Sequence, residues 1–438
     1  MRSTRHDYRL LLTTDSHSAA EALDTACGRY LADLTAWSSA QHRNGDAYEA
    51  QDGVMRIAVG LSTSPNTRDA AAEAATQARE PLTAAAPTLA VLVASPHHAA
   101  RARDVLDTVH EFARPDALVG CVAEAVVAGE REVEAEPAVA VWLAALPKPA
   151  ETFHMEFVRT GTRGVLAGYR FDRDSTDLHL LFPDPHTFPT HLLLAHLNAN
   201  SPSPNVMGGL VSGAMQPGRT TLFHDGKVLN RGAVGARLPG LRALPVVSQG
   251  CRPIGDPYTV TRAEGSLITE LAGRPPLQLL QQLVSRLSPR EEVLVSRGVL
   301  LGIAMVEKAE LNRGDFLIRA VTGADEATGA LQVGDHIEVG TTVRFHVRDS
   351  VTADEDLREA LVNASDMGRP IGALLFTCNG RGTRMFDVPN HDAALVTKLL
   401  GGAPVAGFFA AGELGPVGGQ NFLHGFTASL ALFVDDET

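Results

Sequence analysis

The stretch GELGPVGGQNFLHGFTASLALF, residues 412–433, joins two different kinds of sequence. Its last eight residues, FTASLALF, are largely apolar and are typical of a buried strand. Its first half places Glu413, Asn421 and His424 among glycines, which leave the main chain accessible to a small molecule. We therefore expect a layered fold in which a polar, glycine-rich loop opens beside a buried strand.

Length and charge limit the classes of protein that fit. A chain of 438 residues exceeds one usual compact core, so two domains are expected. Hydrophobic residues at 45% and charged residues at 20% are typical of a soluble globular protein. With 38 Lys+Arg against 51 Asp+Glu, the net charge of -13 repels phosphate backbones and anionic lipid. Nucleic acid and membranes are therefore not expected partners.

Cysteine spacing and the lengths of the apolar runs indicate the cellular compartment of the protein. The four cysteines form no CxxC pair and no CxxCH haem-attachment motif, which favours a reducing cytoplasm. The N-terminal apolar run is too short for a signal peptide, and no stretch approaches the roughly 20 residues of a membrane helix. The GxGxxG, P-loop, GxSxG and HExxH motifs are absent, which disfavours nucleotide binding, serine hydrolysis and a zinc site.

Hydrophobic periodicity alternates between helix and strand along the chain. Helices are predicted over 18–34, 99–114, 190–199, 275–287, 353–364 and 391–402. Strands are predicted over 88–95, 117–126, 132–147, 151–159, 177–183, 266–273, 299–306, 315–323, 372–382 and 405–415. Asp225-Gly226 suits a tight hairpin turn, and the domain junction is expected around it, within 220–244. The pattern predicts an α+β (or α/β) fold, a layered sandwich of mixed sheets with helices outside.

Two segments resemble each other and suggest two related halves. Residues 204–226 and 403–425 each contain an apolar strand, glycines, a Gly/Pro-rich turn and a histidine near the end. Residues 115–129 form a third, weaker copy. The similarity predicts an internal duplication, and unlike topologies of the two segments would reject it.

A second polar group follows the strand in LFTCNGRGTRMF, residues 375–386. Side chains at the end of a buried strand face the crevice where ligands of layered α/β proteins bind. Arg381 offers a planar fork for a carboxylate, and Gly380 exposes backbone amides beside Cys378 and Asn379. The simpler interpretation is a strand ending in a turn, with Cys378 in the core and Arg381 in solvent.

Glu413 and His424 could meet across a hairpin whose turn is residues 416–420. They would then form a charge pair, an acid/base couple or a pair that grips a ligand. The simpler alternative is a structural turn in which a backbone carbonyl satisfies His424. A further alternative is an enzyme with Cys378 as nucleophile and His391 or His424 as base.

Several of these motifs resemble the FIST family, sensory domains of bacterial signal-transduction proteins. The similarity to its C-terminal part lies in residues 248–283, GALLFTCNGRG (372–382) and residues 407–433. GCVAEAVVAG (120–129) and residues 208–238 are similar to its N-terminal part. The resemblance implies a FIST N-terminal domain over 19–230 and a FIST C-terminal domain over 231–438.

The resemblance also implies a function. It predicts a cytoplasmic small-ligand sensor for an amino-acid-like or other small anionic metabolite, with output through a separate signalling protein. Arg381 would hold an anionic group, and Phe409 and Phe422 would pack on the apolar remainder. The predicted ligand-binding residues are Cys378, Asn379, Gly380, Arg381, Phe409, Gly412, Glu413, Asn421 and His424. No cofactor is expected; a haem-binding sensor is an alternative because some family members have been connected to haem.

Overall fold

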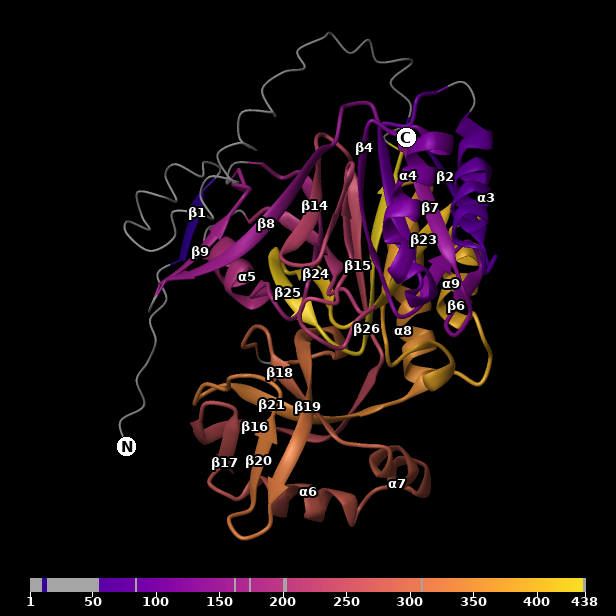
Figure 1. The fold of residues 1–438 in the computed structure, drawn as a ribbon. Helices are drawn as coiled ribbons and strands as arrows, with labels where there is room; N and C mark the ends of the chain where they lie inside the picture. The colour runs from indigo at the N-terminus through magenta and orange to yellow at the C-terminus, as the bar shows by residue number, and fades with distance from the viewer. Residues whose placement is uncertain are drawn as a thin grey trace.

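The computed structural model describes residues 10–13, 55–82, 85–160, 163–172, 175–199, 203–308 and 310–435. Within them, three mixed β-sheets carry helices on their outer faces, and a closed β-barrel lies against one end (Figure 1). The predicted α+β class, a layered sandwich of mixed sheets, is confirmed. The helix predicted over 18–34 lies outside the described residues.

The first sheet is built largely from the N-terminal unit of the chain. The elements of this unit are β2 (Arg56–Ser62), α3 (Thr67–Arg79), β3 (Leu89–Ala94), α4 (Ala102–Ala113), β4 (Ala117–Val122), β5 (Val126–Ala128), β6 (Arg131–Val133) and β7 (Val139–Ala145). β3 and β4 are parallel and joined by α4, and β7 returns antiparallel to β3. The alanine-rich face of α3 and the apolar face of α4 cover this sheet from outside.

The second unit repeats this order. Its elements are β8 (Glu151–Thr160), β9 (Arg163–Ala167), β10 (Leu178–Pro183), α5 (Thr190–Asn198), β11 (Asn205–Gly209), β12 (Leu222–His224), β13 (Lys227–Leu229) and β14 (Ala233–Leu238), and β1 (Leu10–Thr13) pairs with β9. β10 and β11 are parallel, α5 joins them, and β14 is antiparallel to β10. Asp225, at φ 49°, forms the predicted hairpin turn between β12 and β13.

The third unit has the same core order. Its elements are β15 (Ala243–Gln249), α8 (Ser350–Ser365), β22 (Pro370–Cys378), α9 (His391–Leu399), β23 (Val405–Ala410), β24 (Glu413–Val417), β25 (Gln420–His424) and β26 (Thr427–Val434). β22 and β23 are parallel around α9, and β26 is antiparallel to β22. The strand predicted over 405–415 is thus two strands, because the chain leaves one sheet at Ala411 and joins another at Glu413.

The barrel is inserted into the third unit between β15 and α8. Its elements are β16 (Cys251–Glu264), β17 (Leu267–Leu271), α6 (Pro276–Val284), α7 (Pro289–Ser296), β18 (Leu300–Ala304), β19 (Phe316–Asp325), β20 (Ala330–Val333) and β21 (Thr342–Arg348). The strands close in the order β16-β17-β20-β19-β18-β21. A separate cluster of buried apolar side chains, including Val260, Leu301 and Phe345, fills it. Short 3₁₀ turns lie at Arg313–Asp315 within the insertion and at Glu80–Leu82, Pro96–Arg101 and Gly382–Arg384 outside it.

The three units exchange hairpins in a cycle. The hairpin β5-β6 of the first unit pairs with β23 of the third, through β5. The hairpin β12-β13 of the second pairs with β4 of the first, and β24-β25 of the third pairs with β11 of the second. The like topology of 204–226 and 403–425 supports the predicted relation between these segments, and residues 115–129 belong to the same set, so the repeat occurs three times instead of twice.

One glycine occupies the equivalent position in each second parallel strand. Gly120, Gly208 and Gly407 lie opposite a leucine of the preceding strand. A Cβ on them would lie 1.9, 2.0 and 1.8 Å from that leucine's carbonyl oxygen. The repeat therefore needs glycine for close approach of the two backbones.

The inner faces of the three sheets share one apolar core. Phe182, Phe376 and Phe408, from β10, β22 and β23, lie with ring centroids 5.3 to 5.8 Å apart. Burying such aromatic groups drives the sheets together.

None of the helices in the described residues is long and apolar enough to cross a membrane.

Candidate functional site

The polar half of residues 412–433 forms the hairpin β24-β25. Glu413 lies opposite His424, and Gly418 and Gly419 form the turn with φ of 58° and 79°. The predicted turn at residues 416–420 is therefore confirmed. After the hairpin the chain crosses through Phe426 to β26, which belongs to another sheet.

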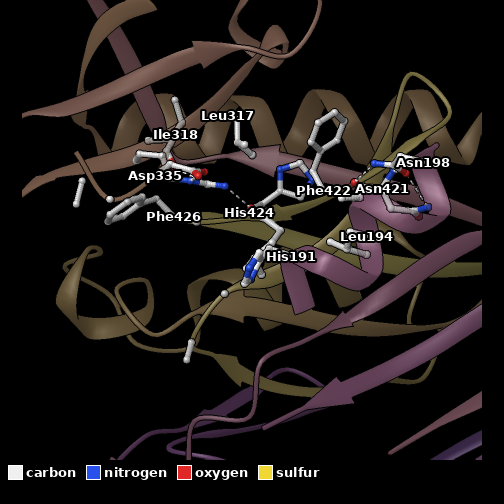
Figure 2. Close-up of a pocket in the computed structure, with 18 residues that line it drawn as sticks. His191, Leu194, Asn198, Leu317, Ile318, Asp335, Asn421, Phe422, His424 and Phe426 are labelled. Atoms are coloured by element: carbon white, nitrogen blue, oxygen red, sulfur yellow. Dashed lines mark hydrogen bonds and ion pairs between the residues drawn. The ribbon is translucent and has the colours of Figure 1, made fainter. Parts of the chain in front are cut away.

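A pocket of about 550 Å³ opens beside this hairpin (Figure 2). Its walls come from α5, from β25 with the turn that follows, and from β19 of the barrel. The lining residues are 191, 194, 195 and 198 of α5, 317–320 of β19, 334–335, 411–412 and 421–426. We call it the α5–β19 pocket. It lies where the sandwich meets the barrel, so its shape depends on how the two are placed.

Apolar side chains and one ion pair define the chemistry of the α5–β19 pocket. Leu194, Leu317 and Phe422 are among its apolar lining groups (Figure 2). Arg319 Nε lies 2.7 Å from Asp335 Oδ2, and Arg319 Nη2 donates to the carbonyl oxygen of Leu423 at 2.9 Å. The side chain of Asp335 is 38% exposed and that of Arg319 is 15% exposed. The apolar hollow thus contains a cation and an anion that are paired with each other.

Four of the residues predicted to contact a ligand line this pocket: Gly412, Asn421, Phe422 and His424. The side chain of Asn421 is occupied, because it accepts from the Val206 amide at 2.9 Å and donates to Ser203 and to the Pro204 carbonyl. It ties the hairpin to the loop after α5.

His424 is held by the backbone, as the simpler interpretation predicted. Its Nε2 lies 3.0 Å from the carbonyl oxygen of Gly415, and burial lowers the pKa of the imidazole to about 4. The ring is therefore neutral near neutral pH, and it packs in the hairpin as a hydrogen-bonded core group.

Other predicted residues meet behind the pocket wall. We call Cys378, Arg381, Asp392, Glu413 and Thr427 the buried polar cluster. Arg381 Nε and Nη2 donate to the two carboxylate oxygens of Asp392 at 2.6 and 2.8 Å, and both side chains are fully buried. Although burial opposes it, the guanidinium holds the pKa of Asp392 well below its usual range. Arg381 is thus paired in the interior rather than solvated.

Glu413 is a fully buried carboxyl group. Its Oε2 accepts from the Thr427 amide at 3.1 Å and from the Thr427 hydroxyl at 2.7 Å, whereas Oε1 has no partner among the described residues. Burial raises the pKa of Glu413 to about 8, so the group is largely protonated near neutral pH. His424 lies opposite it on the ladder, but its ring bonds to Gly415.

The remaining predicted residues lie at the end of β22 and on β23. Cys378 Sγ accepts from the Gly380 amide at 3.5 Å. Asn379 Oδ1 is buried without a partner among the described residues, and its main chain bonds to Ala410. Phe409 packs in the apolar layer under α8 and α9, away from the α5–β19 pocket.

The geometry does not assemble a thiol and a base. Burial, reinforced by Glu413, raises the pKa of Cys378 to about 12. His391 lies 3.0 Å from Asp392 and 2.9 Å from Asp354, so both ring nitrogens are used by carboxylates. A nucleophilic cysteine needs the opposite, a lowered pKa beside a base.

Sequence reasoning missed the residues of the pocket that come from other elements. Arg319, Asp335 and the α5 residues of the pocket are not among the predicted ligand-binding residues. One signal was present: Arg319 is a lone charge in the otherwise apolar run FLIRAV of a strand. Pairing of distant elements then brings it against the hairpin.

Comparison with known proteins agrees with the motifs. The FIST N domain model matches residues 88–274, and the FIST C domain model matches residues 276–416. An uncharacterized protein of Mycobacterium tuberculosis strain H37Rv is 57% identical over 384 residues, which is 87% of this chain and 100% of the relative. An uncharacterized protein of Mycobacterium bovis is 57% identical over 385 residues, with the same two coverages. The chain therefore belongs to the FIST family, whose domains are sensory domains of signal transduction.

Proposed function

We propose that the protein senses a small amino-acid-like metabolite that binds in the α5–β19 pocket. The observation that carries this proposal is a pocket of about 550 Å³ whose walls come from helix α5, the hairpin β24-β25 and the barrel strand β19. Its volume falls in the range of small-molecule sites, and its lining is apolar with few polar groups. A ligand there would touch both the sandwich and the barrel.

The polar groups favour a zwitterion with an apolar side chain. Asp335 would accept from the ligand's ammonium group, and Arg319 would donate to its carboxylate. Leu194, Leu317 and Phe422 would pack on the apolar remainder. Charge-assisted bonds of this kind orient a ligand, and the apolar contacts add affinity.

The signal would leave through the position of the barrel. Ligand contacts with α5 and β19 stabilise one arrangement of sandwich and barrel, and a separate cytoplasmic signalling protein would bind that arrangement. Cys121, Cys251 and Cys378 form no disulfide within the described part of the chain, which fits the proposed cytoplasmic setting.

The test is a screen of the common amino acids by thermal shift, with native mass spectrometry of the freshly purified protein. A ligand at 100 times its dissociation constant raises the free energy of unfolding by about 2.7 kcal/mol. Ala195→Trp should abolish the shift, because exposed Ala195 lines the pocket. Ala199→Trp is the matched control, an exposed alanine one turn further along that does not line it. Equal responses of the two variants, or no amino acid bound, would overturn the proposal.

A further inference from the structure

The strand β25 is the last strand of its sheet, and one of its edges faces the α5–β19 pocket. In the described part of the chain β25 pairs with β24 on one side, and no strand follows it in the sheet. Residues 421–424 of β25 and the two residues after them line the pocket. The N–H and C=O groups of such an edge are a template on which an extended peptide can pair. The state of this edge therefore decides whether the pocket admits peptides.

The side chain of Asn198, the last residue of α5, occupies the edge at Asn421. Its Nδ2 donates to the Asn421 carbonyl at 2.8 Å, and its Oδ1 accepts from the Asn421 amide at 2.9 Å. The main chain of an incoming peptide would make the same two kinds of bond. Figure 2 shows Asn198 beside Asn421 at one end of the pocket. Asn198 thus blocks peptide pairing at this position.

The edge is also closed at the Leu423 carbonyl and in the turn after it. Arg319 Nη2 donates to the Leu423 carbonyl at 2.9 Å, and Arg319 Nη1 donates to the Ile318 carbonyl at 3.0 Å. One guanidinium therefore spans the edges of β25 and β19. Beyond it, a Cβ on Gly425 would lie 3.7 Å from the Ile318 carbonyl oxygen. This contact leaves no place for an added strand, which would lie about 4.8 Å from each neighbour.

Between the closed positions, the amide of Leu423 points into the pocket. In an antiparallel strand the N–H and C=O of one residue face the same side, and residues two apart share that side. The Asn421 main chain and the Leu423 carbonyl both bond to groups on the pocket side, so the Leu423 amide faces that side too. Pro416, which lies opposite Asn421 in β24, has no N–H to donate and fits this pattern.

The Leu423 amide lies beside a guanidinium that has further donors. A guanidinium has five N–H donors, and the bonds to Asp335, Ile318 and Leu423 use one on each nitrogen of Arg319. Each terminal nitrogen keeps one N–H for a ligand. Amide and guanidinium donors together suit a carboxylate, because hydrogen bonds to a charged acceptor are the stronger ones.

The ion pair of Arg319 and Asp335 fits the two charges of a single amino acid. The Nε and Oδ2 atoms of the pair lie 2.7 Å apart, so the cation and the anion that face a ligand are direct neighbours. In a free amino acid the α-carbon alone separates the ammonium group from the carboxylate. In a peptide the whole main chain separates them, and an extended chain cannot place both charges at this pair.

We propose that Asn198 makes the α5–β19 pocket selective for single amino acids over peptides, with the ligand's carboxylate held by the Leu423 amide and Arg319. Asn198 is a specificity residue because it occupies the edge groups that a peptide would use. This inference deepens the proposed function, on which it rests, by naming free α-amino acids as the ligand class. A peptide would have to displace Asn198 from Asn421 before it could pair with β25.

The probes are L-leucine and L-phenylalanine, each compared with its glycine dipeptides by isothermal titration calorimetry. The wild type should bind the free amino acids at least tenfold more tightly than the dipeptides. Asn198→Ala exposes the amide and carbonyl of Asn421, so the dipeptides should gain about tenfold in affinity from two new hydrogen bonds. Asn230→Ala, the same change at an exposed asparagine that does not line the pocket, is the control and should keep the wild-type preference.

Variants at Leu423 test the carboxylate position separately. Leu423→Pro removes the amide on the open edge, where proline costs no ladder bond, and Leu423→Ala keeps that amide. Proline should weaken amino-acid binding about tenfold relative to alanine, because one charge-assisted hydrogen bond is lost. If the proline variant fails to fold, leucinamide replaces leucine as the probe of the wild type, and its neutral end should also cost about tenfold. Equal affinities in either comparison would overturn the carboxylate position.

Failure of the selectivity can be told from failure of the proposed function. Dipeptides that bind the wild type as tightly as the amino acids, with both lost in Ala195→Trp, would leave the pocket as the site and overturn the selectivity. The same preference in Asn198→Ala and Asn230→Ala would overturn the role of Asn198. If no probe binds, the inference falls, and the screen of the common amino acids decides the proposed function.

Discussion

Glu413 keeps its proton in the folded protein at a pH where the unfolded chain has lost it. Its pKa is raised from 4.5 to about 8 by burial, and Glu132 is raised to about 7. A carboxyl group whose pKa is raised by folding contributes to the stability of the folded state. This contribution is complete below pH 4.5 and is lost as the pH rises from there through about 8. Buried histidines such as His424, with a pKa lowered to about 4, act oppositely: their contribution is lost as pH falls from 6.5.

Glu413→Gln should remove one part of this pH dependence. Between about pH 5 and 8 the wild type should lose free energy of unfolding relative to the variant, by up to roughly 1.4 kcal/mol per pH unit. Above about pH 8 the gap should stay constant. Urea unfolding at a series of pH values measures it, and parallel profiles for the two proteins would contradict a buried, protonated Glu413.

Cys378 should be slow to react despite being only partly buried. Because its pKa is about 12 instead of 9.0, the thiolate fraction near neutral pH falls roughly a thousandfold. Iodoacetamide labelling with peptide mapping should therefore modify Cys378 far more slowly in the folded than in the urea-unfolded protein. Rapid labelling of the folded protein would favour the cysteine-dependent enzyme.

Residue types predicted where the polar side chains lie better than they predicted what each side chain does. The structural role of His424, a hydrogen bond to a backbone carbonyl, could be predicted from the hairpin because the partner strand brings carbonyl groups close to the ring. The partner of Arg381 did not follow, because Asp392 stands eleven positions later, after a 3₁₀ turn. Whether a guanidinium meets solvent, ligand or carboxylate depends on such tertiary contacts.

At the scale of elements, one glycine in each unit permits two strands to pair closely. In Gly407→Ala the new Cβ would lie 1.8 Å from the Leu375 carbonyl oxygen, at a φ of 156°. The variant should lose about 3 kcal/mol or more of stability, or fail to fold. Gly314→Ala, where a Cβ meets no atom within 4 Å, should change stability by less than about 0.5 kcal/mol. Thermal unfolding compares the two, and equal stabilities would contradict this role for Gly407.

Local sequence patterns predicted most strands and the two hairpin turns, because apolar alternation and Gly-rich turns can be recognised within a few consecutive residues. It failed at residues 405–415, where an apolar run without a strong turn signal divides between two sheets. The break follows from pairing with β11, about 200 positions earlier, and no local property of the run records that pairing.

At the scale of the molecule, the cyclic exchange of hairpins locks the three sheets together. Each sheet borrows its edge from another unit, so no unit can complete its sheet alone. The sequence similarity of 204–226 and 403–425 predicted related units, but it could not predict which unit receives which hairpin. That choice appears only in pairings between strands far apart in the chain, such as β11 with β24.

The barrel stands outside this exchange, which predicts that the sandwich folds without it. The ends of the insertion meet, because the Asp349 amide donates to the Gly250 carbonyl at 3.3 Å. The barrel also has an apolar core of its own. Replacing residues 251–348 by a short Gly-Ser linker should therefore leave a cooperatively unfolding protein with the secondary structure of the three sheets.

The same deletion should abolish binding in the α5–β19 pocket. It removes Arg319 and Asp335 and with them one wall, while α5 and the hairpin remain. Circular dichroism and calorimetry would report the fold, and the amino-acid thermal-shift screen would report the pocket. A folded sandwich that still binds would place the ligand elsewhere. A chain that no longer unfolds cooperatively would mean that the contact of Arg319 with the Leu423 carbonyl, and others like it, are needed for folding.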